Sequence, residues 1–222
     1  TQSHDGLRVF QASGNGYSSH GFLGATRDDT LHSLTVDSSG NIIIVGEAAM
    51  AWRGPSNQAP LKTYNGGTLD LVVIKLNSSG TYLWHTIYGG ILWDTPSGVV
   101  CDGSGNIYVT GFSNAPWNGP TGQAPVRAYS DGHDWYVLKL NSSGAYQWHT
   151  FLGGNTLDSS DGIAYSSSAA SLFVVGDSLS TSWAGLAPIK THSGGYDVAV
   201  ASLNPTTGAL VWYAFYGTDA DD

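Results

Sequence analysis

The stretch Asp70-Leu-Val-Val-Ile-Lys-Leu-Asn-Ser-Ser-Gly-Thr-Tyr-Leu-Trp-His85 decides how the whole chain is interpreted, because it is repeated. A close copy, Asp134-Trp-Tyr-Val-Leu-Lys-Leu-Asn-Ser-Ser-Gly-Ala-Tyr-Gln-Trp-His149, begins 64 residues later. A weaker third copy runs from Asp197 to Tyr213, and a degraded fourth copy begins at Asp5. A fixed period over most of a chain indicates a repeat architecture.

Each repeat predicts four short strands. Aliphatic, β-branched and aromatic residues fill 70–76, 81–88, 98–102 and 107–111, which suits strands. Turns such as Asn77-Ser-Ser-Gly80 separate them, since Asn and Ser bond to the local backbone and Gly accepts a positive φ. No helical period occurs. Four antiparallel strands per repeat are typical of the blades of a β-propeller.

We therefore predict an all-β fold, a β-propeller of four-stranded antiparallel blades, in a single repeat array over residues 1–222. We expect a half blade of two outer strands at 5–23 and complete blades at 31–88, 97–152 and 162–217. Three and a half blades do not close a ring, because closed propellers have about 4–8 blades. The array is expected to be partial, or completed by assembly through open strand edges near 6–10 and 211–217.

Composition narrows the classes of partner. The chain carries 8 Lys and Arg against 17 Asp and Glu, for a net charge of −9, which disfavours nucleic acid. No apolar run is long enough to span a membrane, so we expect no membrane insertion. The single cysteine, Cys101, forms no disulfide within the chain and is expected at a core position. The Lys-poor composition, rich in Ser, Thr, Asn, Gly and aromatic residues, suggests an extracellular setting, with any signal peptide already removed.

Three sequence segments resemble a known family. They are Trp-His-Thr-Ile-Tyr-Gly-Gly at 84–90, Gly-Val-Val-Cys-Asp-Gly-Ser-Gly-Asn-Ile-Tyr-Val-Thr-Gly at 98–111, and the Gly-Gly, Asp and Val-Ile-Lys-Leu-Asn positions of 66–77. They resemble the SBBP β-propeller repeat. The resemblance covers essentially the whole chain, but it is weaker in the last unit, where Ser166–Ser171 departs from the usual turn, and weakest at the N-terminus. It implies a propeller, usually in secreted or cell-surface bacterial proteins, and it implies no single activity and no catalytic residues.

The predicted loops place candidate binding residues on one face of the blades. The short turns fall on one face, and the long loops 47–69, 112–133 and 177–196 fall on the other, where recognition is expected. Each long loop repeats a Trp, an Ala-Pro pair and a cation, and two of them add amides. These candidate ligand-binding residues are Trp52, Trp117, Trp183, Lys62, Arg127, Lys190, Gln58, Gln123 and Asn118.

Two interpretations of these loops remain open. The tryptophans could be exposed platforms that stack on sugar rings, with the amides bonding hydroxyl groups. Alternatively, each Trp packs beneath its own loop, and the cation stacks on an aromatic ring.

Two series of aspartates are also candidates. Asp70, Asp134 and Asp197 begin strands, where we expect them to cap backbone amides. Asp94 and Asp158 precede the innermost strands and could face a central channel and bind a metal such as calcium, although one carboxylate per blade is few for the 6–8 oxygen ligands that Ca²⁺ takes. No cofactor is otherwise expected.

The sequence leaves three functional hypotheses. The first, which the repeats favour, is a non-enzymatic extracellular or cell-surface module for adhesion, scaffolding or self-assembly, with other protein chains or further blades as partners. The second is a lectin-like propeller that binds cell-surface glycans through the Trp loops. The third is a metal-dependent lyase or hydrolase at the channel mouth. His85 and His149 follow tryptophans on an outer strand, without a nucleophile or acid nearby, so we expect them to be structural.

Overall fold

The computed structural model describes residues 7–13, 16–24, 29–183 and 185–221, and all regular structure in these ranges is β-strand. No helix in this part of the chain could span a membrane. The strands are β1 (Leu7–Ser13), β2 (Gly16–Leu23), β3 (Asp29–Val36), β4 (Ile42–Ala48), β5 (Asp70–Leu76), β6 (Tyr82–Tyr88), β7 (Asp94–Cys101), β8 (Ile107–Ser113), β9 (Asp134–Leu140), β10 (Tyr146–Leu152), β11 (Asp158–Ser166), β12 (Ser171–Ser178), β13 (Asp197–Leu203) and β14 (Leu210–Tyr216).

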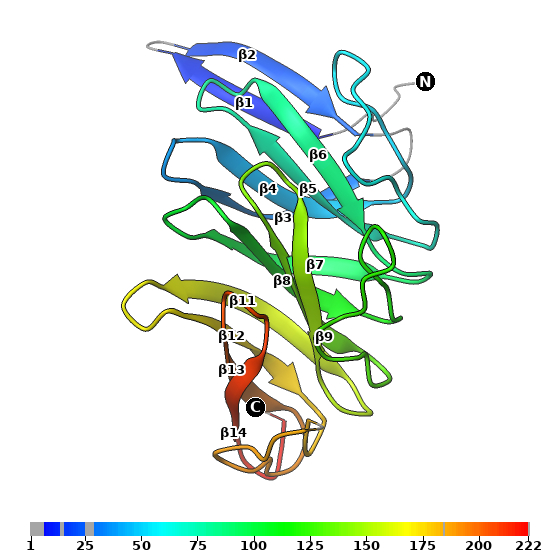
Figure 1. Ribbon diagram of the computed structural model, residues 1–222, viewed down its shortest axis with the longest axis vertical. Helices are drawn as coiled ribbons and strands as arrows, with labels where there is room; N and C mark the ends of the chain where they lie inside the picture. The colour runs from blue at the N-terminus through cyan, green and yellow to red at the C-terminus, as the bar shows by residue number, and fades with distance from the viewer. Residues whose placement is uncertain (1–6, 14–15, 25–28, 184, 222) are drawn as a thin grey trace.

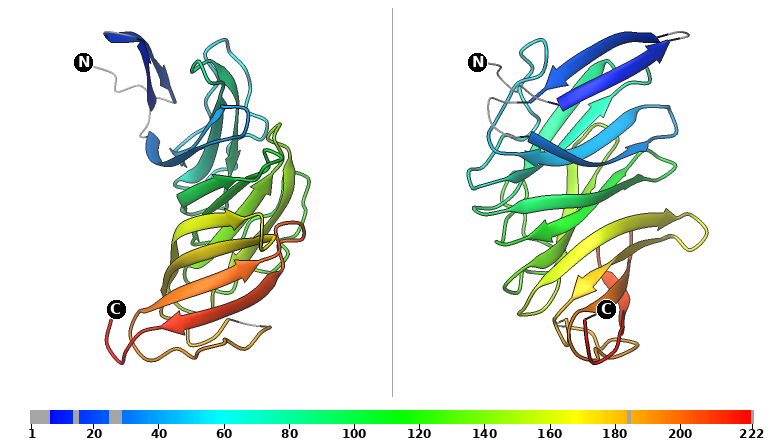
Figure 2. Two further views of the ribbon diagram at one scale, coloured as in Figure 1. Left: turned by 90° about the vertical axis from the view of Figure 1, so that its left-hand side faces the viewer. Right: turned by 180° about the vertical axis from the view of Figure 1, so that it is seen from behind.

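The strands form three four-stranded antiparallel sheets and one hairpin. The sheets have the orders β3-β4-β5-β6, β7-β8-β9-β10 and β11-β12-β13-β14, and β1 pairs with β2. Figures 1 and 2 show the sheets following one another in an open arc, with the β1–β2 hairpin at one end and β11–β14 at the other. The all-β prediction with blade-like four-stranded sheets is confirmed, and within the described residues the sheets do not close into a ring. Residues 5, 6, 14 and 15 of the expected half blade lie outside the described residues.

The first strand of each sheet begins earlier than the sequence pattern suggests. The strands β7 and β11 start at Asp94 and Asp158, before the expected starts at 97 and 162. A β-bulge between Pro96 and Gly98 interrupts the alternation of side chains, so the pattern conceals the first residues of the strand. Opposite this bulge the backbone approaches closely, because a Cβ added at Gly111 would lie 2.0 Å from the Thr95 carbonyl oxygen.

Side chains between successive sheets form the cores. One cluster joins Val73 of the first sheet to Val109 and Leu138 of the second. The next joins Trp135 and Val137 of the second sheet to residues of the third, and its members include Leu172, Val174, Ala199, Ala201, Tyr213 and Phe215. Each sheet is therefore stabilised by the apolar face of its neighbour.

The long loops return along the outer strands. The amide of Leu61 donates to the His85 carbonyl oxygen (2.9 Å), and Ile87 donates to the Lys62 carbonyl oxygen (3.0 Å). The same pair of bonds recurs on β10, and on β14 it joins 189–190 to Tyr213 and Phe215. The expectation of an open edge along 211–217 is therefore wrong for these groups, because the chain's own loop pairs with this strand.

Candidate functional site

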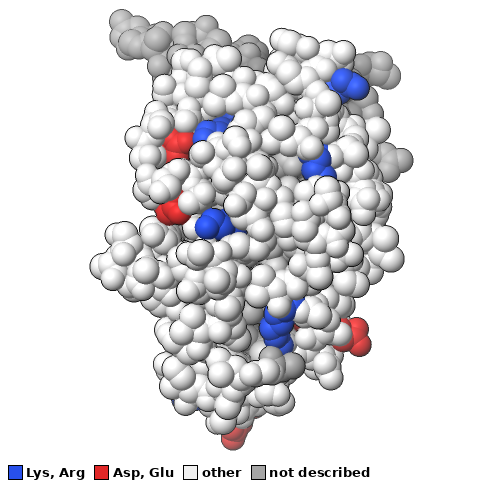
Figure 3. All heavy atoms as spheres, in the orientation of Figure 1, with Lys and Arg blue, Asp and Glu red and all other residues white. Residues whose placement is uncertain are grey.

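The two ends of the strands differ in the length of their connections. The turns 37–41, 77–81, 102–106 and 141–145 lie at what we call the turn end of the array. The loops 49–69, 114–133 and 179–196, together with the connections 89–93 and 153–157, lie at the loop end. On the face shown in Figure 3, charged side chains are few and scattered, so uncharged surface dominates there.

The three loop tryptophans are buried. Trp52, Trp117 and Trp183 are 6%, 5% and 1% exposed, respectively. Trp52 stacks on His85 with ring centroids 3.7 Å apart, and Trp117 stacks on His149 at 3.9 Å. Trp183 stacks on Tyr213 at 4.6 Å, where tyrosine replaces the histidine.

This burial overturns the interpretation of Trp52, Trp117 and Trp183 as exposed platforms for sugar rings. Packing beneath the loop removes the large apolar faces of these indoles from water, and the free energy gained by burying this surface favours the buried position. The histidines accordingly serve packing: Tyr146 Oη lies 2.8 Å from His149 Nδ1, and His149 Nε2 lies 3.0 Å from the Trp117 carbonyl oxygen. Burial lowers the pKa of His149 to about 4 and therefore favours the neutral ring.

The loop cations bind their own sheets. Lys62 donates to the Ile87 carbonyl oxygen (3.2 Å) and lies 5.1 Å from the centroid of the Tyr88 ring. Arg127 donates to the carbonyl oxygens of Phe151 and Gly153 at 3.3 and 3.0 Å. Lys190 lies 5.0 Å from the centroid of the Tyr216 ring. These contacts hold the returning loop against the outer strand.

Two of the three candidate loop amides form hydrogen bonds within their own loops, and the third is exposed. The Gln58 side-chain oxygen accepts from the Ser56 amide at 2.9 Å, and Gln123 accepts from Thr121 at 3.0 Å. Both glutamines thus close the tight turn of their own loop. Asn118 is exposed.

The strand-initiating aspartates lie in pairs beneath glycines. A Cβ atom added to Gly89 would lie 2.5 Å from Asp70 Oδ1 and 2.6 Å from Asp94 Oδ2. A Cβ atom added to Gly153 would collide with Asp134 Oδ1 and lie 2.8 Å from Asp158 Oδ2. Each pair joins the third strand of one sheet to the first strand of the next.

These carboxylates bond to protein groups. Asp134 Oδ2 accepts from the Ser130 amide at 2.6 Å, so the prediction that this series caps backbone amides is confirmed. Asp94 accepts from the Gly90 amide (2.7 Å) and the Ser113 hydroxyl, and Asp158 accepts from the Gly154 amide and from Ser178 and Ser180.

Asp94 and Asp158 do not face an open channel, because both are fully buried at separate junctions between sheets. Burial raises the pKa of Asp94 to about 7 and that of Asp134 to about 7, since a carboxylate loses hydration there. Among the described residues, no group of three or more His, Cys, Asp or Glu side chains is placed to hold a metal ion.

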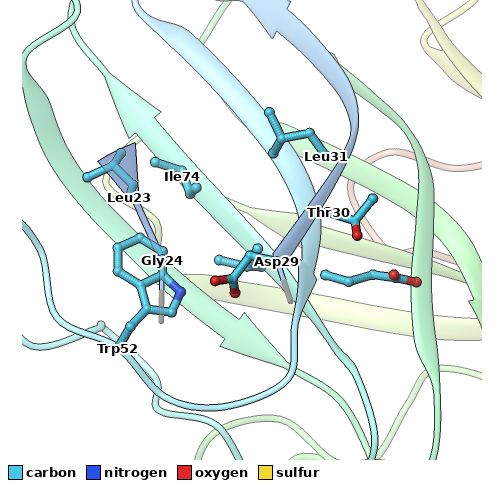
Figure 4. A pocket seen from close by; sticks show the side chains of 9 residues that line it. Leu23, Gly24, Asp29, Thr30, Leu31, Trp52 and Ile74 are labelled. Carbon is cyan, nitrogen blue, oxygen red and sulfur yellow. The ribbon is translucent and has the colours of Figure 1, made fainter. Parts of the chain in front are cut away.

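A small hollow lies beside the first sheet. Figure 4 shows Trp52 and Asp29 lining it, with Leu23, Leu31 and Ile74 around them. Leu23 of β2 belongs to the apolar cluster of this sheet, so the hairpin contributes to its cover. The hollow is enclosed mainly by packed side chains and offers little open surface.

Single exposed apolar side chains occur in the long loops of the loop end, such as Leu61, Val126 and Ile189, but a run of three lies in the connection between β6 and β7. Ile91, Leu92 and Trp93 are 73%, 45% and 48% exposed, respectively. Their backbone is held in place: Asn114 donates to the Trp93 carbonyl oxygen at 3.0 Å, and Leu69 and Trp93 form a parallel bridge. The array therefore presents an indole and two aliphatic side chains from a fixed backbone.

Our sequence reasoning missed this segment, although a signal was present. Connections between strands are normally polar, and the equivalent residues in the next repeat are Asn155-Thr156-Leu157. Three consecutive apolar residues after Gly89-Gly90 depart from that pattern. The tryptophans were chosen as candidates because they recur in each repeat. In a repeat array, however, a recurring residue mainly indicates that each unit packs in the same way.

Comparisons with known proteins support the repeat assignment. The pattern of the SBBP β-propeller repeat matches residues 83–116, which include β7, β8 and the exposed 91–93 segment. The sequence resemblance to this repeat is therefore confirmed for that segment. The chain is also 28% identical over 98 residues to an uncharacterized WD repeat-containing protein, L264, of Acanthamoeba polyphaga mimivirus. The match covers 38% of this chain and only 6% of that relative's length.

Proposed function

We propose that this chain is a non-enzymatic propeller module that binds another protein at its loop end. The single observation that carries this proposal is the exposed Ile91-Leu92-Trp93 segment, held by backbone bonds on a scaffold of packed sheets. Exposed apolar clusters of this kind are typical of protein interaction sites, and Trp is enriched among the residues that dominate binding energy. A prearranged backbone also reduces the entropy lost on binding.

The repeat also suggests which larger array the chain belongs to and where it acts. Both the SBBP match and the WD repeat-containing relative support a propeller, since WD repeats also form four-stranded blades. We take the chain as three blades and a half blade of an array that further blades or other chains complete. An adhesive or scaffolding role outside the cell is consistent with the few charged residues, 11% of the chain.

A peptide-selection experiment tests this proposal. A random peptide library displayed on phage would be selected against the immobilised chain, and the enriched peptides would be measured by titration calorimetry. We expect Trp93→Ala to weaken their binding at least tenfold, because truncation removes a central apolar contact. The fold should be retained in circular dichroism, since Trp93 is half exposed.

The matched control is Leu83→Ala on β6, a side chain of similar exposure (45%) outside the 91–93 segment. It should leave binding unchanged. Peptides that bind both variants as tightly as the wild type, or a selection without enrichment, would show that the 91–93 segment is not the binding surface.

A further inference from the structure

A groove with a volume of about 580 Å³ lies between the long loops of the second and third sheets. One wall is the segment 126–130 of the second loop, which returns along β10. The other wall is formed by Gly185 and Leu186 of the third loop and by Ala209 and Leu210 at the start of β14. Pockets that bind ligands have volumes of about 300–1,000 Å³ and mainly apolar walls. The groove therefore has the size and the lining of a binding site.

The groove lies where the third repeat departs from the other two. In the first two loops a closed turn packs on the tyrosine that begins the outer strand, since a Cβ added at Gly54 would lie 2.7 Å from the Tyr82 ring and one at Gly119 would lie 2.9 Å from the Tyr146 ring. Six residues separate the Trp from the Ala-Pro pair in those loops, but only three do so in the third loop. Leu210 also replaces the tyrosine. The second junction thus has neither the closed turn nor the ring that the first junction has.

The cation of the second loop also has a different neighbour. In the first and third repeats the loop lysine lies over the tyrosine that ends the outer strand, Tyr88 or Tyr216. The second repeat has Leu152 at this position, so the end of β10 supplies no ring to Arg127. The hydrogen bonds of Arg127 to two backbone carbonyl oxygens use N–H groups at the edge of the guanidinium. Its flat faces are the surface on which aromatic rings stack.

Both walls of the groove are fixed by hydrogen bonds. The Tyr213 hydroxyl accepts from the Trp183 amide at 2.9 Å and donates to the Leu186 carbonyl oxygen at 2.8 Å. The opposite wall is held to β10 by two backbone hydrogen bonds. Among the residues that the structure describes, none bonds to the amide or the carbonyl oxygen of Ala128. This wall therefore offers a backbone edge of the kind to which an extended peptide pairs.

We propose that the groove binds an aromatic side chain of an extended peptide from a partner protein. The ring packs on the guanidinium of Arg127, between Val126 and the wall formed by Leu186 and Leu210, and the peptide backbone pairs with Ala128. Complementarity of charge favours this occupant, because the face of an aromatic ring is negative and Arg127 alone is charged among the described residues that line the groove.

Two blocked pentapeptides test the proposal, with phenylalanine or cyclohexylalanine at the centre and the same valine and threonine residues around it. Cyclohexylalanine keeps the apolar volume of the side chain but lacks the π face. Each peptide would be titrated into the isotope-labelled chain and followed by NMR. We expect the amide signals of 126–130 and 185–186 to shift. The phenylalanine peptide should bind about two- to fivefold more tightly, because only its ring makes a cation–π contact.

A substitution that fills the groove provides the second test. Leu210→Tyr restores the ring that the other outer strands have at this position, so the variant should fold and should no longer bind the phenylalanine peptide. Val211→Tyr is the matched control, since the neighbouring valine is 53% exposed and does not line the groove. This control should bind the peptide like the wild type.

Trp93→Ala separates this inference from the proposed function. The inference goes beyond that function, because the groove does not include the 91–93 segment, and the variant should bind both pentapeptides like the wild type. Loss of binding in Trp93→Ala but not in Leu210→Tyr would overturn the inference and leave the proposed function standing. Equal affinities for the two peptides, or an absence of shifts in the groove at millimolar peptide, would also overturn it.

Discussion

The two ends of the strands use the same residue, aspartate, in opposite ways. At the turn end, Asp37 accepts from the amides of Ser39 and Asn41 and from the Asn41 side chain, and it forms an ion pair of 2.9 Å with Lys75. Burial opposes ionisation there, but the hydrogen bonds from Asn41 and Lys75 prevail and lower the pKa of Asp37 to about 2. At the loop end, burial prevails and raises the pKa of Asp70 to about 6.

The difference follows from the balance between burial and hydrogen bonds. Asp37 retains some exposure and accepts several hydrogen bonds, so its anion is stabilised, whereas Asp158 is fully buried and its pKa is raised although Gly154, Ser178 and Ser180 donate to it. The Oδ1 atoms of Asp70, Asp134 and Asp197 are buried without a hydrogen-bond partner. The turn end is thus held by charged and polar links, and the loop end by aromatic packing around carboxylates that ionise with difficulty.

The largest expected effect concerns that aromatic packing. Trp117→Ala should lower the free energy of unfolding by about 3–5 kcal/mol, since a buried indole stacked on His149 is removed and a cavity remains. At the turn end, Asn141→Ala removes the acceptor for the amides of Ser143 and Ala145, which should cost about 1–3 kcal/mol for two hydrogen bonds. Urea unfolding measures both. Equal losses would mean that the two ends contribute alike.

A smaller effect is expected from one methyl group at the carboxylate pair. A Cβ at Gly153 would collide with Asp134 Oδ1 and lie 2.8 Å from Asp158 Oδ2, so Gly153→Ala should destabilise the fold by about 1–3 kcal/mol. Gly103 in a turn is the matched control, because nothing lies within 4 Å of its added Cβ. Gly103→Ala should change stability by less than about 0.5 kcal/mol in the same urea titration. A tolerated Gly153→Ala would show that the carboxylate pair is free to move apart.

The last comparison uses the pH dependence of stability. The folded-state pKa of Asp94 is raised from 3.8 to about 7, so its contribution to stability is present below pH 4 and is lost as the pH rises towards 7. Asp94→Asn should therefore become more stable relative to the wild type between pH 4.5 and 7.5, as measured by urea midpoints. Nearby Lys62 and Asp70 remain in both proteins, as do His85 and His149, so their titration largely cancels in the difference.

The turn end supplies the control for this comparison. Hydrogen bonds from Asn106 and Tyr108 lower the pKa of Asp102 despite partial burial, so this carboxylate is ionised in both the folded and the unfolded chain above about pH 5. The difference between Asp102→Asn and the wild type should then stay constant from pH 5 to 7.5. A pH-independent difference for Asp94→Asn would contradict the raised pKa at the loop end.

Much of the fold could be predicted from the chain itself, and the site much less so. The alternation in 81–88 and the Asn77-Ser-Ser-Gly80 turn specify a hairpin locally, and the 64-residue repeat indicates that the same sheet recurs. The bulge at 96–98 was missed because it breaks the alternation on which strand prediction rests. The tryptophans were correctly identified as a repeated feature of the loops, but the sequence did not decide whether they were exposed.

By itself, the sequence determined the all-β class, the four strands per repeat, the positions of the tight turns and the capping role of the strand-initiating aspartates. These features depend on contacts between residues close together in the chain, which periodicity and turn chemistry report directly. Only the tertiary structure decided that Trp117 is buried while Trp93 is exposed, and that Asp94 lies beside Asp70. Each of these outcomes depends on which surfaces meet when separate sheets pack, and burial set by that packing is not encoded in the type of any one residue.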